Sequence, residues 1–169
     1  MAINSNPHVH NLVMCANVFV RKDGKFLVLK RSAKKKHLAN FIHPIGGKIE
    51  ADEDPYIGAV REVKEEANID IKNLKLESVI LEVQYHQDMD ENWLIFNFTA
   101  DYDSGTITDT DEGELILLSK KELLNAELFA SIKETIEQTL NPDDATIFAT
   151  FTYNEKGEIA TKTINTCQL

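Results

Sequence analysis

Residues 47–69, GKIEADEDPYIGAVREVKEEANI, contain a loop followed by a helix with recognisable ends. Three acidic residues at 52–54 precede Pro55, and acidic groups followed by proline are typical of the start of a helix. We predict a helix over about residues 54–67. Asn68 follows it, and asparagine tolerates the left-handed conformation in which helices often end. The pattern therefore predicts one well-delimited helix in the first half of the chain.

Three glutamates share one face of this helix. Glu62, Glu65 and Glu66 stand at positions i, i+3 and i+4. Carboxylates crowded on one face repel each other, and a divalent cation would turn that repulsion into binding energy. Carboxylate oxygens are the ligands that Mg²⁺ prefers, and water and substrate phosphates complete its shell. Glutamate-rich helices are also common as solvated surface, so the three glutamates alone do not establish a metal site.

The whole segment fills a longer pattern, G-x5-E-x7-R-E-U-x-E-E-x-x-U, in which U is an aliphatic residue. Average residue frequencies give a chance match of about one in a million for a chain of this length. The positions in register are Gly47, Glu53, Arg61, Glu62, Val63, Glu65, Glu66 and Ile69. The segment resembles the Nudix box, the signature of the Nudix hydrolases. It departs from the box at Asn68, where the family usually has glycine.

The resemblance implies a metal site. By similarity to the family, Glu62 and Glu66 ligate an essential Mg²⁺, for which Mn²⁺ can substitute. Glu65 completes or bridges the cluster, and the carbonyl of Gly46 adds a backbone ligand. The metal would neutralise the phosphates of the substrate, activate a water and stabilise the leaving phosphate.

The resemblance also implies roles for residues around the metal. Arg61 orients carboxylates, and Glu53 anchors Arg61. The general base is either a glutamate of the box or a carboxylate from a later loop. Glu112, in the acidic segment 109–114, is the best outside candidate and is also a candidate metal ligand. An exposed acidic turn is the alternative interpretation of that segment.

Four residues are candidates for binding the substrate. Lys48 resembles the lysine that contacts phosphate in 8-oxo-dGTP diphosphatases of the MutT type. Arg31 and His37 lie in a basic segment that resembles the one those enzymes place around their nucleotide, and His43 precedes the box. The implied substrate is a nucleoside di- or triphosphate derivative, including an oxidised dNTP. Diadenosine polyphosphates, other nucleotide-X compounds and non-catalytic nucleotide binding stay open as alternatives.

The charge of the chain limits its partners. The formal net charge is −10 over 169 residues, and so acidic a chain is poorly suited to hold a nucleic-acid backbone. The lysines at 34–36 are either a landing place for phosphate or solvated surface. No apolar run is long enough to span a bilayer, and Cys15 reads as a buried free thiol. We expect a cytoplasmic protein with a small nucleotide substrate; monomer and homodimer are both open.

The rest of the pattern predicts a mixed sheet. A strand over residues 9–21 and one over 26–30 flank Asp23-Gly24, a strong hairpin signal. Further strands are predicted at 69–84, 92–101 and 114–118, helices at 120–125 and 128–140, and a closing hairpin at 145–153 and 158–164. With the resemblance, this order implies an α/β fold (α+β mixed sheet), the Nudix α/β/α sandwich with a C-terminal β-hairpin. We expect a flexible N-terminal tail over residues 1–8 and a single Nudix hydrolase domain over 9–169.

Overall fold

The computed structural model describes residues 11–32, 40–83, 91–110, 113–140 and 145–168. These residues form three helices and nine strands, in an order that follows the prediction closely. The elements are β1 (Leu12–Lys22), β2 (Lys25–Arg31), β3 (Ile42–His43), β4 (Ile45–Lys48), α1 (Pro55–Ala67), β5 (Ile69–Val83), β6 (Asn92–Gly105), β7 (Gly113–Leu118), α2 (Lys120–Leu124), α3 (Ala130–Thr139), β8 (Ala145–Tyr153) and β9 (Ile159–Gln168). The predicted tail, residues 1–8, lies outside the described residues.

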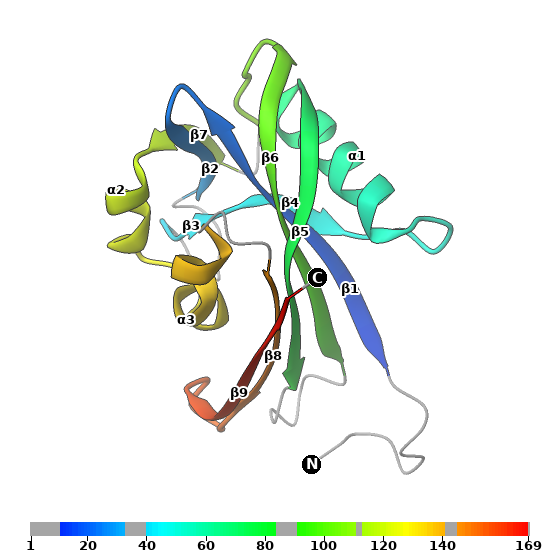
Figure 1. Ribbon diagram of the computed structural model, residues 1–169, viewed down its shortest axis with the longest axis vertical. Helices are drawn as coiled ribbons and strands as arrows, with labels where there is room; N and C mark the ends of the chain where they lie inside the picture. The colour runs from blue at the N-terminus through cyan, green and yellow to red at the C-terminus, as the bar shows by residue number, and fades with distance from the viewer. Residues whose placement is uncertain (1–10, 33–39, 84–90, 111–112, 141–144, 169) are drawn as a thin grey trace.

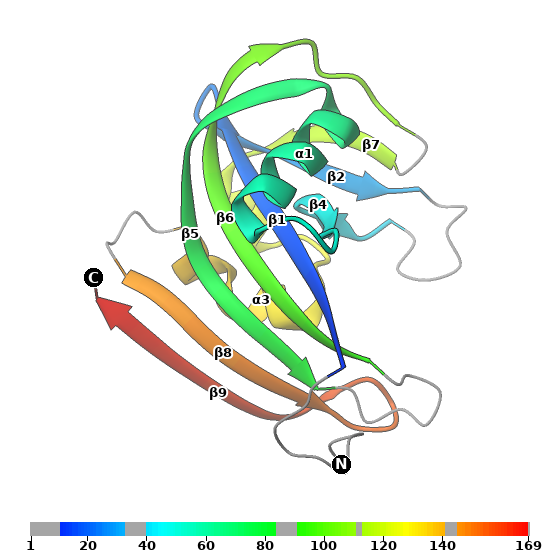
Figure 2. The same ribbon diagram turned by 90° about the vertical axis from the view of Figure 1, so that its right-hand side faces the viewer.

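The strands form one mixed sheet in the order β3-β2-β1-β6-β5-β8-β9. β4 pairs with β1 and β7 pairs with β2, off this path. The β1–β6 and β5–β8 pairs are parallel, and the other pairs are antiparallel. Helix α1 covers one face of the sheet, while α2 and α3 lie on the other (Figures 1 and 2). The predicted α/β/α sandwich and its closing hairpin, β8–β9, are confirmed.

Both ends of α1 follow from its sequence. The Asp54 side chain accepts hydrogen bonds from the backbone N–H groups of Tyr56 and Ile57 at 2.8 and 2.9 Å. These bonds satisfy two donors that have no partner inside the helix. Asn68 ends the helix at φ 54°, and its N–H bonds to the Lys64 carbonyl. Asparagine therefore serves where the family usually has glycine.

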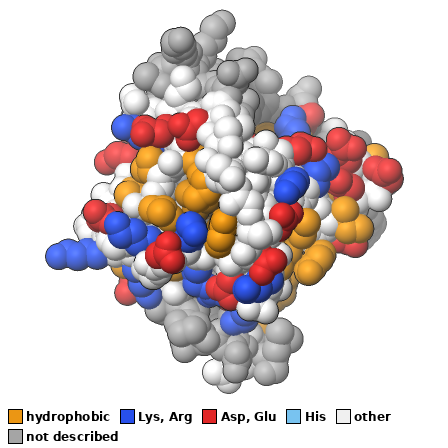
Figure 3. All heavy atoms as spheres, turned by 90° about the horizontal axis from the view of Figure 1, so that it is seen from above, with side chains coloured by type: hydrophobic (Ala, Val, Ile, Leu, Met, Phe, Trp, Pro, Cys, Tyr) orange, Lys and Arg blue, Asp and Glu red, His pale blue; other side chains and the backbone are white. Residues whose placement is uncertain are grey.

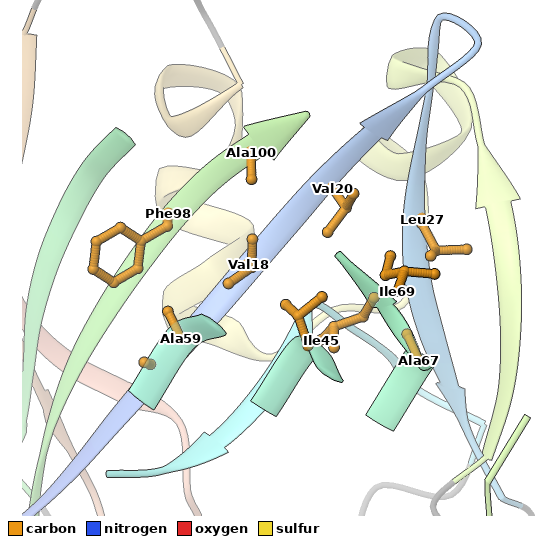
Figure 4. Close-up of a cluster of buried hydrophobic side chains, with 11 residues drawn as sticks. Val18, Val20, Leu27, Ile45, Ala59, Ala67, Ile69, Phe98 and Ala100 are labelled. Carbon is orange, nitrogen blue, oxygen red and sulfur yellow. The ribbon is translucent and has the colours of Figure 1, made fainter. Parts of the chain in front are cut away.

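The core beneath α1 combines helix and sheet. Buried residues on α1, such as Ala59, pack against Val18 of β1 and Ile45 of β4 (Figure 4), and Val63 belongs to the same cluster. Small side chains on α1 bring its axis close to the sheet. Two further clusters lie under α2 and α3 and beside β8. This packing leaves α1 with its glutamates directly beside the short strand β4.

Several boundaries differ from the prediction, three of them informatively. Helix α3 begins at Ala130, because Leu128 pairs with Ile42 in a parallel bridge and the Glu127 carbonyl accepts from the Ile42 N–H at 2.9 Å. β6 continues to Gly105, and β9 to Gln168, since each has a long antiparallel partner.

None of the helices in the described ranges is long and apolar enough to cross a membrane. Seen from above, acidic and basic side chains are intermixed with hydrophobic groups on that face (Figure 3).

Candidate active site

Two glutamates of α1 converge on the backbone of β4. The Gly46 N–H donates to Glu66 Oε2 at 3.0 Å. A Cβ added to Gly47 would lie 2.7 Å from Glu62 Oε2, so the carboxylate occupies the space that a side chain would fill. A Cβ on Gly46 would collide with the carbonyl oxygen of Ala16 on β1. The two glycines therefore allow α1 to press both carboxylates against one short stretch of backbone.

Arg61 uses all five of its N–H donors in this region. Its Nε and Nη2 bind the two oxygens of Glu53 at 2.7 and 3.0 Å, which is a bidentate pair. Nη1 donates to Glu62 at 2.9 Å and to Glu65 at 3.1 Å. The fifth bond reaches the Lys48 carbonyl at 2.9 Å. The predicted contact between Arg61 and Glu53 is confirmed, and it ties the loop, the helix and β4 together.

The surroundings of Glu53 and Glu62 shift the pKa values of the two carboxyls in opposite directions. Hydrogen bonds from Arg61, with one from the Glu50 N–H, hold the pKa of Glu53 below its ordinary value. Burial raises the pKa of Glu62, and Arg61 opposes that effect. Glu65 and Glu53 raise the Glu62 pKa further by repulsion. A cation placed beside Glu62 would therefore favour its ionised form.

The donor set suits a hard divalent cation. Carboxylates of Glu62 and Glu66 meet at the Gly46–Gly47 backbone, and oxygen donors are what Mg²⁺ requires. Among the described residues, no three acidic, histidine or cysteine side chains are already gathered around one point. The reason is visible: Arg61 draws Glu62 and Glu65 toward itself, while Glu66 is held by the Gly46 N–H. The residues fit the metal chemically, and binding would exchange these contacts for metal–oxygen bonds.

A cavity of about 360 Å³ opens beside Gly46 and Gly47. Its wall comes from β1, β2, β3, β4, β5, β6 and α3. The lining residues are Cys15, Asn17, Arg31, His43, Gly46, Gly47, Lys48, Glu82, Trp93, Ile95, Phe129, Ser131 and Ile132. Three of the four predicted substrate-binding residues thus line one cavity, next to the two glutamates.

Those three residues offer different groups. Arg31 Nε is buried and has no hydrogen-bond partner in the described part of the chain. Lys48 Nζ lies 5.5 Å from the centroid of the Trp93 ring. His43 Nδ1 lies 2.6 Å from the Pro44 carbonyl oxygen, which can only accept, so Nδ1 carries the proton. The pKa of His43 is lowered to about 4, chiefly by burial; the bond to Pro44 opposes this shift, and the charge of Arg31 adds to it.

Two predicted site residues lie outside the described ranges. His37 belongs to residues 33–39 and Glu112 to residues 111–112, so both stay predictions. The lysines at 34–36 lie in the same undescribed segment.

Sequence reasoning missed the residues that form the far wall of the cavity. Glu82 on β5 and Trp93 on β6 are register partners, so their side chains share a face. Asn17 on β1 donates to Asn97 Oδ1 at 3.0 Å and also lines the cavity. A lone glutamate inside a strand, E in SVILEV, was the available signal. Nothing in the sequence alone connects it to Trp93.

A larger and more open hollow, about 540 Å³, lies on the outside of α1. It is lined mainly by exposed residues such as Tyr56 and Ile57, together with Arg61 and Glu65. It lacks the Gly46–Gly47 backbone and the three predicted substrate-binding residues. The smaller cavity is therefore the better candidate for the active site.

Comparisons with known proteins agree with this fold. A MutT protein from Bacillus halodurans is similar in structure, with a TM-score of 0.77 and 22% identity over 90% of this chain and 97% of that chain. A MutT Nudix hydrolase from Burkholderia pseudomallei has a TM-score of 0.64 and 21% identity over 76% and 98%. A UDP-X diphosphatase has a TM-score of 0.56 and 18% identity over 81% and 65%. No curated protein sequence matches the chain significantly.

The family model described as the NUDIX domain matches residues 11–151. This range holds both carboxylates at β4, the Arg61 centre and the whole lining of the cavity. The chain therefore belongs to the NUDIX family, and it is a hydrolase that acts on pyrophosphate bonds.

Proposed function

We propose that this chain is a Mg²⁺-dependent hydrolase of the pyrophosphate linkage in a nucleoside di- or triphosphate derivative. One observation carries the proposal. Glu62 and Glu66 meet the Gly46–Gly47 backbone at the edge of a cavity that also contains two cationic side chains, Arg31 and Lys48. A pyrophosphate carries several negative charges, which a metal ion and nearby cationic side chains together would neutralise. The candidate metal ligands and the two cationic side chains lie within this one region.

The proposed metal ligands are Glu62, Glu65, Glu66 and the Gly46 carbonyl, with Mn²⁺ as a substitute ion. When bound, the ion neutralises phosphate charge and lowers the pKa of a water for attack. Glu65 is the most exposed of the three, with 59% of its side chain accessible, so it can turn toward an arriving ion at little cost. Glu112, outside the described residues, stays a candidate fourth carboxylate.

The chain's own residues position the reactants. Arg61 keeps Glu62 and Glu65 on the side of α1 that faces Lys48. Arg31 and Lys48 are the proposed phosphate contacts, since the buried Arg31 Nε has no other described partner. Neutral His43 presents its Nε2 as an acceptor. The proposed general base is one of the glutamates of the box or Glu112.

The proposed unit is a single domain over residues 9–169, in a reducing cytoplasm. Free Cys15 and Cys167 support that location. A small nucleotide is proposed as the ligand, rather than a nucleic acid, because the net charge is −10.

A nucleotide joined to a second group is the alternative substrate. It is favoured by a hollow of about 420 Å³ that shares Phe129 with the active-site cavity and also contains Phe41 and Lys133. A second aromatic pocket beside the first is what a dinucleoside polyphosphate would use.

The test is a panel of nucleotides and nucleotide-X compounds, assayed with Mg²⁺ for released phosphate and pyrophosphate. We expect turnover that disappears in excess chelator and returns with Mg²⁺ or Mn²⁺. Glu62→Gln and Glu66→Gln should each lower turnover by about 10²-fold or more. Glu137→Gln, an exposed carboxylate on α3, is the matched control and should change little. Full turnover in chelator, or near-native Glu62→Gln and Glu66→Gln enzymes, would overturn the proposal.

A further inference from the structure

Glu82 is a buried carboxyl that the proposed chemistry does not use. It is 3% exposed, and from β5 it lines the same cavity as the Gly46–Gly47 backbone of β4. Burying a carboxyl in this way is costly unless hydrogen bonds compensate. Because Glu82 lines a cavity large enough for a ligand, a bound ligand could add to the hydrogen bonds that the protein makes to it.

The protein supplies part of that bonding. The Tyr153 hydroxyl donates to Glu82 Oε1 at 3.0 Å. Burial raises the pKa of Glu82, and the Ser131 and Tyr153 hydroxyls lower it. The Ser131 hydroxyl is itself fully buried, and in the described part of the chain its oxygen has no partner with good hydrogen-bond geometry. The wall around Glu82 therefore holds a polar group whose hydrogen bonding a ligand could complete.

An aromatic surface stands beside this carboxyl. Trp93 is the register partner of Glu82 across β5 and β6, and both line the cavity. Tryptophan offers a flat face on which a nucleobase can stack. Lys48 Nζ, a proposed phosphate contact, lies 5.5 Å from the ring centroid. The cavity therefore brings a cation, an aromatic face and a buried hydrogen-bond acceptor close together, in the same lining as the Gly46–Gly47 backbone.

We propose that Glu82 selects the nucleobase, by accepting hydrogen bonds from N–H groups on the edge of a base that stacks on Trp93. The inference rests on the proposed function, since it assigns the other end of the same nucleotide. An ionised carboxylate only accepts hydrogen bonds, and it can accept two parallel ones. Guanine presents two adjacent donors, N1–H and the 2-amino group. Adenine and cytosine place a ring-nitrogen acceptor beside their amino group, which would repel the carboxylate. Guanine-type nucleotides are thus the predicted ligands.

The first test needs no mutation. Wild-type kcat/KM should be compared for guanosine, inosine and adenosine nucleotides of the same phosphate length. Inosine lacks only the 2-amino group, so we expect about a 10-fold loss against guanosine, and a larger loss for adenosine. Equal values for guanosine and inosine, or a preference for adenosine, would overturn the assignment of Glu82.

The second test changes the carboxyl. Glu82→Gln should lower kcat/KM for the guanosine nucleotide by about 10- to 100-fold, mainly through KM, and should reduce its advantage over adenosine. Glu77→Gln is the matched control: Glu77 is a carboxyl on the same strand, 2% exposed, bonded by the Thr99 hydroxyl and absent from the cavity wall. It should keep the wild-type preference. The same loss on every nucleotide in Glu82→Gln would mean that Glu82 is structural.

A binding measurement separates this inference from the proposed hydrolysis. Trp93 is the single tryptophan of the chain, so its fluorescence reports on the cavity alone. A non-hydrolysable α,β-methylene guanosine triphosphate should quench it at lower concentration than the adenosine analogue. Quenching with this order but no turnover of any nucleotide would refute the hydrolase and keep the base site. Turnover without base preference or quenching would refute the base site alone.

Discussion

Protonation of His43 should contribute to the loss of folding stability of this protein at acidic pH. The pKa of His43 lies at about 4 in the fold against 6.5 in an exposed histidine, because burial disfavours the charged ring. The unfolded chain therefore binds a proton at a pH where the folded chain does not. The stability that His43 contributes is fully present above 6.5 and is lost as the pH falls toward 4.

The size of this effect follows from the same values. A tenfold change in proton affinity is worth about 1.4 kcal/mol, so the difference between 6.5 and about 4 corresponds to about 3 kcal/mol. At about pH 4.5 most of this contribution to the free energy of unfolding has been lost. Because part of the ring also faces the cavity, we expect the loss at this pH to be about 2 kcal/mol. For a domain of this size that lowers Tm by about 4–8 °C.

The assay compares the wild type with His43→Asn, whose side-chain amide can still donate to the Pro44 carbonyl that His43 Nδ1 contacts. Denaturant unfolding at about pH 8 and about pH 4.5 gives four free energies of unfolding, and all other titrating groups cancel in their double difference. We expect the wild type to lose about 2 kcal/mol more than the variant on acidification. An equal loss in both proteins would show that His43 titrates normally and would refute this reasoning.

Three further predictions test the surroundings of the site. In calorimetry without metal, Arg61→Ala should lower the Tm clearly more than Lys64→Ala does, because Arg61 makes five hydrogen bonds while Lys64 makes one exposed ion pair with Asp70. Equal decreases in Tm would contradict this. Gly47→Ala should keep the native circular dichroism spectrum but lower turnover by about 10²-fold, since the new Cβ displaces the Glu62 carboxylate; an unchanged turnover would contradict this. Burial raises the pKa of Cys15 to about 12, so a thiol reagent should label Cys167 at once and Cys15 only after unfolding; rapid labelling of both would contradict this.

The part of the site that lies on α1 could be predicted from sequence because it is local. Asp54 and Asn68 mark the ends of the helix, and the i, i+3, i+4 spacing places its glutamates on one face. The contact between Glu53 and Arg61 was also predictable, since one loop and one helix hold both. The short helix α2 followed in the same way from the capping box of Ser119 and Glu122.

The far wall of the cavity could not be predicted because it depends on strand pairing. Glu82 and Trp93 face each other only through the register of β5 and β6. That pair contains register shifts, between Lys72 and Lys75 and again after Leu76, and each shift alters which side chains point inward. A period-two pattern read along β5 therefore does not reveal that Glu82 lies inside. Helix α3 begins later than its sequence predicts for a similar reason, since Leu128 pairs with Ile42, far away in the chain.

The central claim is that the glutamates of α1 form a metal site that drives hydrolysis of a pyrophosphate bond. The most direct measurement titrates Mn²⁺ into the wild type, Glu62→Gln and Glu66→Gln, following bound ion by electron paramagnetic resonance and nucleotide hydrolysis in the same samples. The account predicts saturable binding in the wild type, hydrolysis that rises in step with occupancy, and a loss of both in each variant. Equal Mn²⁺ binding by all three proteins, or hydrolysis that proceeds before any ion is bound, would contradict it.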